Sequence, residues 1–399
     1  MADSTPDTET RTASEPHRPF APDESQRAVI ALPADASGTV VGAPGTGKTA
    51  TLVARVRALT QDGTGLTADH VLVLTPSRTT ATALRDRLGL AVGGATSGAL
   101  AHSITSFAFR LVRGAEVHAG GEPPRLLTGG DEDQLIQDLL AGDAEDEASG
   151  AQRWPAWLPA DIRATRGFRS EVRAFFAECI TLGVEPDRLA RLGARFERES
   201  WTAMASFFRE YLQVRADMRG AHRDAAGLVR EAVGLVRSAG DAVLAELTRA
   251  RVILVDDAQE LTLGGVELLE ACRARGIAVL AFGDPDVGAG AFRGATPENF
   301  ARLSASLREV HVLAAPHRGV HVLAAPHRGT ASMTDLARAV TAHIGAGGVV
   351  AHRRAPGGVA VGDEVQTMLP RSAAEEYDVI ARLAGNGTCA TGSAGSGAR

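Results

Sequence analysis

The feature that most constrains the fold of this chain is a glycine-rich segment of eight residues that joins an apolar run to a stretch with helical spacing. The apolar run is Thr39-Val40-Val41, and the stretch places Leu52, Val56 and Leu59 on one face. The segment fits the pattern G-x-x-x-x-G-K-[ST] of a phosphate-binding loop, in which inward-pointing N–H groups and a helix dipole attract phosphate. We expect all eight residues to line a nucleotide site: Gly42, Ala43, Pro44, Gly45, Thr46, Gly47, Lys48 and Thr49.

Lysine usage supports this interpretation. Lys and Arg together number 42, yet Lys48 is the only lysine in the sequence. A compact ammonium group fits between phosphate oxygens where a planar guanidinium group does not. We therefore predict that Lys48 contacts the outer phosphates and that the Thr49 hydroxyl holds Mg²⁺. The alternative is a chance match to the pattern, which the single lysine disfavours.

Paired carboxylates follow an apolar strand predicted at residues 251–255. Asp256 and Asp257 end that strand, and Gln259 follows shortly after. In phosphate-loop enzymes one such aspartate holds Mg²⁺ and the next acid orients the attacking water. An apolar strand followed by acids is common, but it gains weight from the glycine-rich loop upstream. We predict that Asp256 is a metal ligand and that Asp257 positions water.

A short helix is predicted upstream of the loop. Pro22 and Asp23 suit a helix start, and Val29 and Ile30 supply a buried face. Gln26 lies on this helix, and a glutamine amide both donates to and accepts from one adenine edge, so Gln26 would select ATP. A solvated helix glutamine is the alternative, and it would be favoured if no other feature indicated a nucleotide.

Bulk composition indicates a soluble globular protein without a global basic surface. The chain has 399 residues, of which 44% are hydrophobic and 23% charged, and its formal charge is −6. A nucleic-acid partner would therefore need a locally basic groove. Cys179, Cys272 and Cys389 show no metal-ligand or disulfide spacing, and no run of residues indicates a membrane span or a secretory leader. These features favour the cytoplasm.

Strands, loops and helices alternate in the first and last thirds of the chain, which is typical of a parallel α/β sheet with ligands at the carboxyl ends of its strands. Strands are predicted at residues 71–75 and 277–282 besides 251–255. This places residues 75–78 and 103–106 at the working edge of the sheet.

The middle of the chain has a different character. Helical periodicity dominates from about residue 114 to 249, with an acidic loop predicted at 142–149, so we interpret this stretch as a helical insertion. Trp154, Trp157 and Trp201 all lie here, and packing between helices is their expected role rather than stacking on bases.

A tandem duplication follows the last predicted strand. The ten residues 310–319 are repeated without change as residues 320–329. One copied decapeptide is too short to form a solenoid, and only one copy can occupy the original site. The repeat is either a recent duplication or an error in the gene sequence.

Taken together, these motifs resemble the N-terminal half of a UvrD/Rep-type superfamily-one DNA helicase. Their sequences are similar to those of the actinobacterial AdnA-type helicase–nuclease branch. The resemblance covers roughly residues 20–385 and rests on several motifs in the family's order. The family's D-E-x-Q element corresponds to residues 256–259, and its G-D-x-x-Q…F-R-G-A element corresponds to residues 283–287 and 292–295.

The resemblance implies an α/β fold of the P-loop NTPase class, with a RecA-like parallel sheet, a helical insertion and a truncated second RecA-like domain. The expected division is a first RecA-like domain at 20–113 and 250–316, the insertion at 114–249, the start of the second domain at 317–384, and disordered ends at 1–19 and 385–399.

The resemblance also implies an ATP-dependent DNA helicase or translocase that couples ATP hydrolysis to movement on single-stranded DNA. ATP and Mg²⁺ would be its cofactors, DNA repair its setting, and a helicase–nuclease subunit its protein partner. The family's arginine that senses the γ-phosphate corresponds to Arg318 or Arg328: spacing from Arg293 favours the first, and continuity with the next helix favours the second. Gln259 belongs to the same catalytic set.

Single-stranded DNA would cross the carboxyl edge of the sheet, where aromatic rings stack on bases and arginines meet phosphates. For each phenylalanine, core packing is an alternative of equal weight. The expected contacts are Thr75, Arg78, Ser103, Phe107, Phe292 and Arg293.

Four departures from the family pattern bear on activity. Asp257 stands where the family usually has a longer glutamate, which predicts slowed hydrolysis. Val287 replaces a glutamine that links the γ-phosphate to the DNA site, and Gly290 replaces an aromatic residue, so the coupling of ATP to DNA is open to question. Because nothing after Arg328 resembles the family's later motifs, this sequence is expected to bind ATP much better than it hydrolyses it.

Two other functions fit the same loop. One is a P-loop ATPase of the AAA type that remodels proteins, and the other is a nucleotide-binding remnant without turnover. Salt-sensitive binding of single strands would separate the motor from the first, and ATPase assays with and without DNA would separate it from the second.

Overall fold

The computed structural model describes residues 20–61, 63–92, 98–218, 222–291, 294–308, 319–323, 325, 327, 331–344, 351–354 and 368–387. The expectation of disorder at residues 1–19 lies outside these residues. So do Phe292, Arg293, Arg318 and Arg328, together with most of the first copy of the decapeptide.

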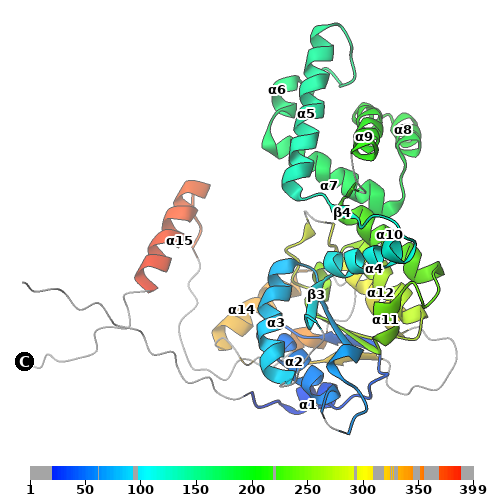
Figure 1. Cartoon of the computed structure of the whole chain (residues 1–399). Helices are drawn as coiled ribbons and strands as arrows, with labels where there is room; N and C mark the ends of the chain where they lie inside the picture. The colour runs from blue at the N-terminus through cyan, green and yellow to red at the C-terminus, as the bar shows by residue number, and fades with distance from the viewer. Residues whose placement is uncertain are drawn as a thin grey trace, which may run out of the picture.

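The described residues form a parallel sheet of six strands, in the order β3-β2-β6-β7-β1-β8 (Figure 1). Every neighbouring pair in it is parallel, as the alternation of strands and helices predicts. One strand, β7, separates the strand before the glycine-rich loop from the strand that ends in the paired acids. The strands are β1 (Gly38–Val41), β2 (Val71–Thr75), β3 (Ala101–Ser103), β6 (Val252–Val255), β7 (Ala278–Gly283) and β8 (Gly319–Val322).

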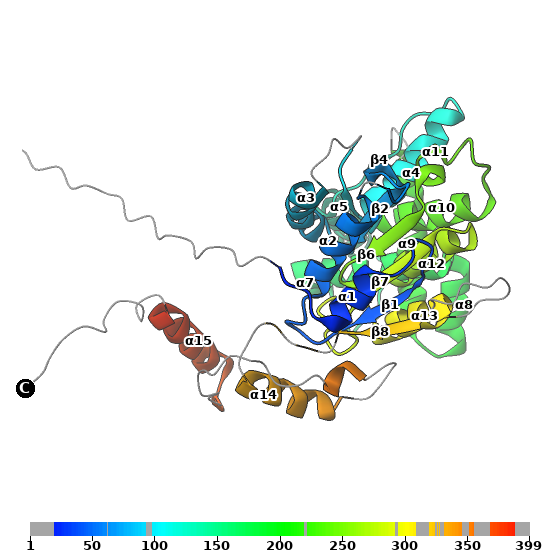
Figure 2. The ribbon, with the colours of Figure 1, turned by 90° about the horizontal axis from the view of Figure 1, so that it is seen from below.

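Helices cover both faces of this sheet, which explains why its strands are apolar without alternation. Ile253 and Val255 point to one face, where they pack with helices α4, α10, α12 and α13. Val252 and Leu254 point to the other face and pack with α1, α2 and α3, and Figure 2 shows the two layers on opposite sides. The sheet helices are α1 (Glu24–Ile30), α2 (Lys48–Leu59), α3 (Arg78–Val92), α4 (Ile104–His118), α10 (Ala225–Ser238), α11 (Ala245–Arg249), α12 (Leu263–Ala274) and α13 (Pro297–Arg308), with 3-10 turns η1 (Ala68–His70) and η2 (Ala258–Glu260).

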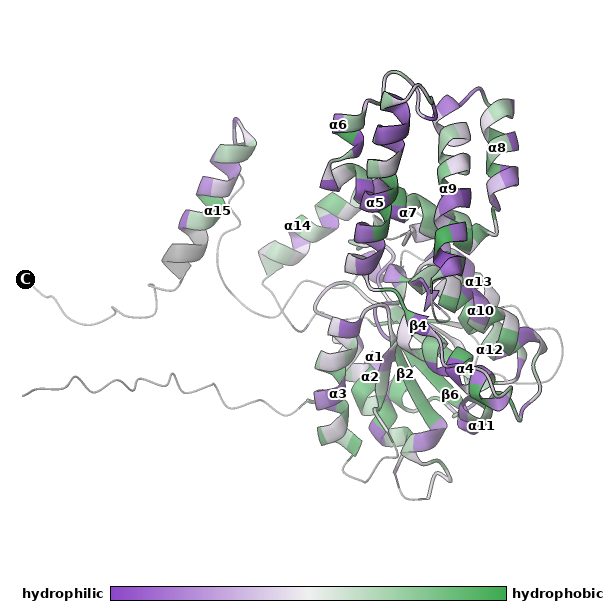
Figure 3. Cartoon of the chain, turned by 45° about the horizontal axis from the view of Figure 1, so that its top comes forward, coloured by the Kyte–Doolittle hydropathy of each residue, from purple (hydrophilic) through white to green (hydrophobic). Residues whose placement is uncertain are grey.

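A separate lobe of helices stands above the carboxyl edge of the sheet (Figures 1 and 3). It has its own apolar core, built around Phe176, Phe207 and Phe208, as a helical insertion would. The predicted limits of 114–249 are too wide, because α10 and α11 pack in the core of the sheet domain. The lobe consists of β4 (Arg125–Leu126), α5 (Gly129–Ala148), α6 (Ala160–Arg163), α7 (Arg166–Leu182), α8 (Pro186–Arg195), α9 (Glu199–Asp217) and β5 (His222–Arg223).

The prediction of an acidic loop at 142–149 is wrong, because α5 continues through it. Two of its acids are fixed by partners elsewhere in the lobe. Asp143 accepts a hydrogen bond of 2.7 Å from the indole of Trp154, and Glu147 pairs with the buried Arg163 at 2.6 Å. Trp154 is buried, as expected for helix packing, whereas Trp157 is exposed.

The boundary predicted between residues 316 and 317 also requires correction. Strand β8, which runs from the last residue of the first decapeptide copy into the second copy, pairs with β1, and Leu323 is buried in the core of the first sheet. The first domain therefore extends past residue 316. Beyond it lie α14 (Ala331–Ala342), η4 (Ala351–Arg354) and α15 (Ala373–Gly387), and α15 continues into the tail expected to be disordered.

Candidate functional site

The glycine-rich loop connects β1 to α2 and lies at the carboxyl edge of the sheet. Gly45 and Gly47 adopt positive φ angles of 84° and 78°, which favour glycine over other residues. A side chain at Gly47 would also place its Cβ 2.7 Å from the amide nitrogen of Gln26. The loop is thus shaped by backbone conformations and close approaches that require glycine, as the phosphate-cradle interpretation expects.

Lys48 begins α2 and turns its ammonium group back over the loop. Its Nζ donates hydrogen bonds to the carbonyl oxygens of Gly42 at 2.7 Å and Ala43 at 3.2 Å. Burial lowers the pKa of Lys48, and the negative charges of Asp284, Asp257 and Asp256 act in the opposite direction. The cation is thus held at the mouth of the loop, where a phosphate would meet it.

Thr49 and Asp256 meet across the sheet although 207 positions separate them in the sequence. The Thr49 hydroxyl donates to Asp256 Oδ2 at 2.8 Å, while Oδ1 is buried and has no hydrogen-bond partner among the described residues. Burial first, and the neighbouring charge of Asp257 second, raise the pKa of Asp256 to about 6. A carboxylate oxygen without a partner beside a hydroxyl is a fitting pair of ligands for Mg²⁺.

Asp257 and Gln259 belong with Asp256 to the acidic motif, residues 256–259, and the structure gives each a distinct position. Asp257 adopts a left-handed conformation with φ of 51°, a strained backbone of the kind found at functional sites. Gln259 accepts a hydrogen bond of 3.1 Å from the backbone N–H of Asp284, which fixes the end of β7 beside the motif. A catalytic role for either residue stays a prediction.

Gln26 lies beside the loop and is fully buried, at 0% exposure. Its Nε2 donates to the carbonyl of Thr46 at 3.0 Å, and its Oε1 accepts from the N–H of Asp23 at 3.0 Å. A solvated helix glutamine is therefore excluded. The amide joins α1 to the loop, and its selection of adenine stays a prediction.

The second copy of the decapeptide passes the same loop. His327 donates its backbone N–H to the carbonyl of Gly45 at 2.8 Å, and its ring contacts Asp23 at 2.9 Å. This copy therefore runs from β8 to the glycine-rich loop. The neighbouring Arg328 and the earlier Arg318 both lie outside the described residues, so the choice between them stays a prediction.

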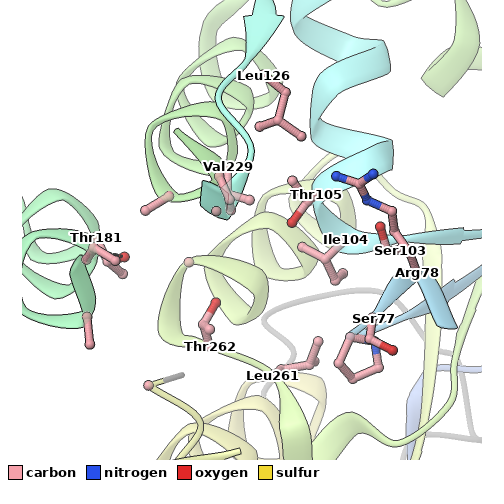
Figure 4. A pocket seen from close by; sticks show the side chains of 18 of the residues that line it. Ser77, Arg78, Ser103, Ile104, Thr105, Leu126, Thr181, Val229, Leu261 and Thr262 are labelled. Carbon is pink, nitrogen blue, oxygen red and sulfur yellow. Dashed lines mark hydrogen bonds between the residues drawn. The ribbon is translucent and has the colours of Figure 1, made fainter. Parts of the chain in front are cut away.

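A cavity of about 610 Å³ separates the sheet domain from the helical lobe (Figure 4). The turn after β2 and the start of α4 line one side, where Figure 4 shows Ser77, Arg78, Ser103 and Thr105. Helices α5, α7 and α10 line the other side, and residues 260–262 form part of the floor. We refer to this cavity as the groove.

Among the expected DNA contacts that the structure describes, Arg78 alone is exposed and lines the groove. Ser103 also lines the groove, but it is 1% exposed and its hydroxyl is bonded to Ser106 at 2.9 Å. Thr75 is buried, and its hydroxyl donates to the carbonyl of Ser77 instead. Phe107 is 3% exposed and packs in the core, so the packing alternative is correct and no base can stack on its ring in this conformation.

The sequence does not predict the acidic residues that line the groove. Glu132, Glu178 and Glu260 line it together with a single described arginine, Arg78. Burial and the charge of Asp224 raise the pKa of Glu132 to about 7. Only Glu260 carried a signal in the sequence, because it directly follows the D-D-A-Q element, whereas the other two reach the groove through the packing of the lobe.

Two acids at the end of β7 meet the C-terminal segment. Arg353 pairs with Asp286 at 2.5 Å, and His352 approaches Asp286 at 2.8 Å and Asp284 at 3.4 Å. These carboxylates and the imidazole lie close enough together to hold a metal ion, but Arg353 already engages both oxygens of Asp286. The cluster is therefore an ionic contact between η4 and the loop after β7.

Comparison with known proteins supports the interpretation of these motifs. Residues 23–308 match the family model described as the UvrD/REP helicase N-terminal domain. A search among characterised proteins found no match. Within the described part of the chain, no helix combines the length and apolar character needed to cross a bilayer.

Proposed function

Because the chain belongs to the UvrD/Rep helicase family through an N-terminal domain that spans residues 23–308, we propose that it is an ATP-dependent motor acting on single-stranded DNA. The observation that carries the proposal is the meeting of the glycine-rich loop with Asp256 at the carboxyl edge of the sheet. The hydrogen bond of 2.8 Å from Thr49 to Asp256 joins the two halves of the nucleotide site.

Each part of the site has a defined task in this proposal. Loop N–H groups and Lys48 bind the phosphates, Gln26 recognises adenine, and Thr49 with Asp256 holds Mg²⁺. Bound Mg²⁺ would neutralise charge on the phosphates. Asp257 orients the attacking water. Gln259 holds the end of β7 beside the acidic motif through its hydrogen bond with the N–H of Asp284. Arg328 would complete the charge stabilisation from the chain that follows β8.

DNA binding in the groove is supported by its position and its polar lining. Arg78 would meet backbone phosphate, and the hydroxyl groups of Ser77 and Thr105 would donate to phosphate or sugar oxygens. The negative charges of the three glutamates repel the DNA backbone, so we expect the described part of the groove to bind DNA only weakly by itself. Phe292 and Arg293 would add stacking and charge.

Fluorescence anisotropy with a labelled oligothymidine tests the DNA proposal. We expect binding that weakens with salt, and a shallower salt dependence, by about one unit of slope, for Arg78→Ala. Arg87→Ala is the matched control, because Arg87 is an exposed arginine of the same helix that does not line the groove. Absence of salt-sensitive binding, or equal slopes for the two variants, would contradict the proposal.

ATPase assays with and without the oligonucleotide separate a motor from a nucleotide-binding remnant. A motor hydrolyses ATP faster when DNA is bound, and a slow rate is expected because Asp257 is shorter than glutamate. Turnover that is absent under both conditions would favour the remnant. The comparisons give no support for the AdnA-like branch or for a nuclease partner subunit, so the proposal does not include them.

A further inference from the structure

The turn after β6 contacts both the groove and the loop that follows β7. Glu260 ends this turn, η2, and is one of the residues that line the floor of the groove. Its Oε1 accepts a hydrogen bond of 2.7 Å from the backbone N–H of Ala289. Its neighbour Gln259 accepts from the N–H of Asp284 at 3.1 Å. The successive side chains of Gln259 and Glu260 therefore hold two points of one loop, residues 284–291.

Further contacts make this loop and the turn one unit. Thr262 and Ala295 form an isolated antiparallel bridge. The amide of Asn299 donates to the carbonyls of Leu261 at 3.2 Å and Gly294 at 3.0 Å. A displacement of the turn would therefore be transmitted to the loop. The segment that carries the turn extends from Asp256, at the proposed nucleotide site, to Glu260, in the lining of the groove.

Gly290 provides the space that Glu260 occupies. A Cβ added at Gly290 would lie 2.4 Å from Oε2 of Glu260, so no larger residue fits while the carboxylate keeps its position. The family pattern has an aromatic residue there, and a glutamine at the place of Val287. Val287 is 43% exposed and its side chain has no hydrogen-bonding group. Both departures, Val287 and Gly290, therefore lie in the loop that the Glu260 carboxylate contacts.

We propose that Glu260 is a positioning residue that couples nucleotide binding to DNA binding in this chain, in place of the absent glutamine. The inference rests on the proposed function, since it needs both ligands. Glu260 touches neither the phosphates nor Mg²⁺. It acts through Ala289, by holding the loop after β7 against the turn η2, which lines the floor of the groove.

The test is thermodynamic linkage in the full chain. Anisotropy gives the affinity for a labelled oligothymidine with and without saturating Mg²⁺ and a non-hydrolysable ATP analogue, and the ratio of the two is the coupling factor. Wild type is expected to show a ratio that differs from one by about fivefold or more. Glu260→Ala should bring the ratio to about one, whereas Glu260→Gln, which keeps the acceptor for Ala289, should retain most of it.

Glu178→Ala is the matched control, because it also removes one carboxylate from the groove but leaves the Ala289 bond intact. It should change DNA affinity without changing the coupling factor. Calorimetry with the ATP analogue shows whether Glu260→Ala still folds and binds nucleotide. Wild-type coupling in Glu260→Ala, or a wild type that binds both ligands with a ratio of one, would overturn the inference. A wild type that binds neither ligand would overturn the proposed function as well.

Discussion

At the scale of single residues, burial sets the electrostatic character of both ligand sites. It raises the pKa of Asp256 and Glu132 and lowers that of Lys48, so each charge is less favourable in the folded protein than in water. In the proposed function, Lys48 and Asp256 would bind ligands of opposite charge, the phosphates and Mg²⁺. Glu132 has no such ligand, because DNA in the groove would carry the same negative charge.

Glu132 therefore predicts a pH-dependent stability. Its folded-state pKa of about 7 exceeds the usual value of 4.5, so its contribution to stability is present below pH 4.5 and is lost as pH rises through 7. Asp224 and Asp131 oppose its ionisation, and Arg173 and Arg215 favour it. Compared with wild type, Glu132→Gln should gain about 1–3 kcal/mol of unfolding free energy at pH 8 and almost none at pH 4.5.

Urea unfolding at the two pH values measures this difference. Glu178→Gln serves as the control, because Glu178 is exposed. A gain for Glu132→Gln that is the same at both pH values would show that packing, and not ionisation, determines the effect.

At the scale of elements, α1 is attached to the glycine-rich loop through one amide. Gln26→Ala removes the donor to Thr46 and the acceptor for Asp23, and it should lower the unfolding free energy by about 1–3 kcal/mol. If Gln26 also recognises adenine, the same variant should lose its preference for ATP over GTP. Thermal unfolding and calorimetry measure the two effects, with Gln26→Glu as an isosteric control that keeps only the acceptor. An unchanged preference would refute the adenine role.

Elements with strong local signals could be predicted from the sequence, and elements defined by distant partners could not. The apolar runs at β1, β2, β6 and β7 and the loop before α2 were all recognised, because periodicity and glycine placement are local. The sequence predicts a loop where α5 continues, because the partners that fix its acids, Trp154 and Arg163, are distant in the sequence. Strand β8 was assigned to the wrong domain, since only its pairing with β1 shows where it belongs.

The same distinction holds for the candidate site. Phosphate and metal ligands follow from motif chemistry, and the structure brings Lys48, Thr49 and Asp256 to one edge. Phe107 could not be placed by its sequence, because stacking and packing use the same ring. Glu260 was passed over because its partner, the N–H of Ala289, belongs to a segment with no side-chain signal.

At the scale of the whole molecule, the two apolar cores of the sheet domain and the core of the lobe are separate. All three tryptophans, at 154, 157 and 201, lie in the lobe, so fluorescence excited selectively at tryptophan reports on it alone. Phe207→Ala should destabilise the lobe by about 3–5 kcal/mol, because Phe207 is fully buried beside Trp154. The fluorescence transition should shift to lower urea while ATP affinity stays within about twofold of wild type. A parallel loss of ATP affinity would show that the lobe and the sheet domain unfold together.

In the proposed function, the ammonium group of Lys48 and the carboxylate of Asp256 together bind a magnesium-bound triphosphate at the carboxyl edge of the sheet. Calorimetry of ATP binding in the presence of Mg²⁺, for wild type and Lys48→Ala, tests it most directly. Loss of a charge-assisted contact of about 1.5–3 kcal/mol predicts at least about a tenfold weaker affinity for the variant, with its thermal unfolding little changed. Equal affinities for the two proteins would contradict the account.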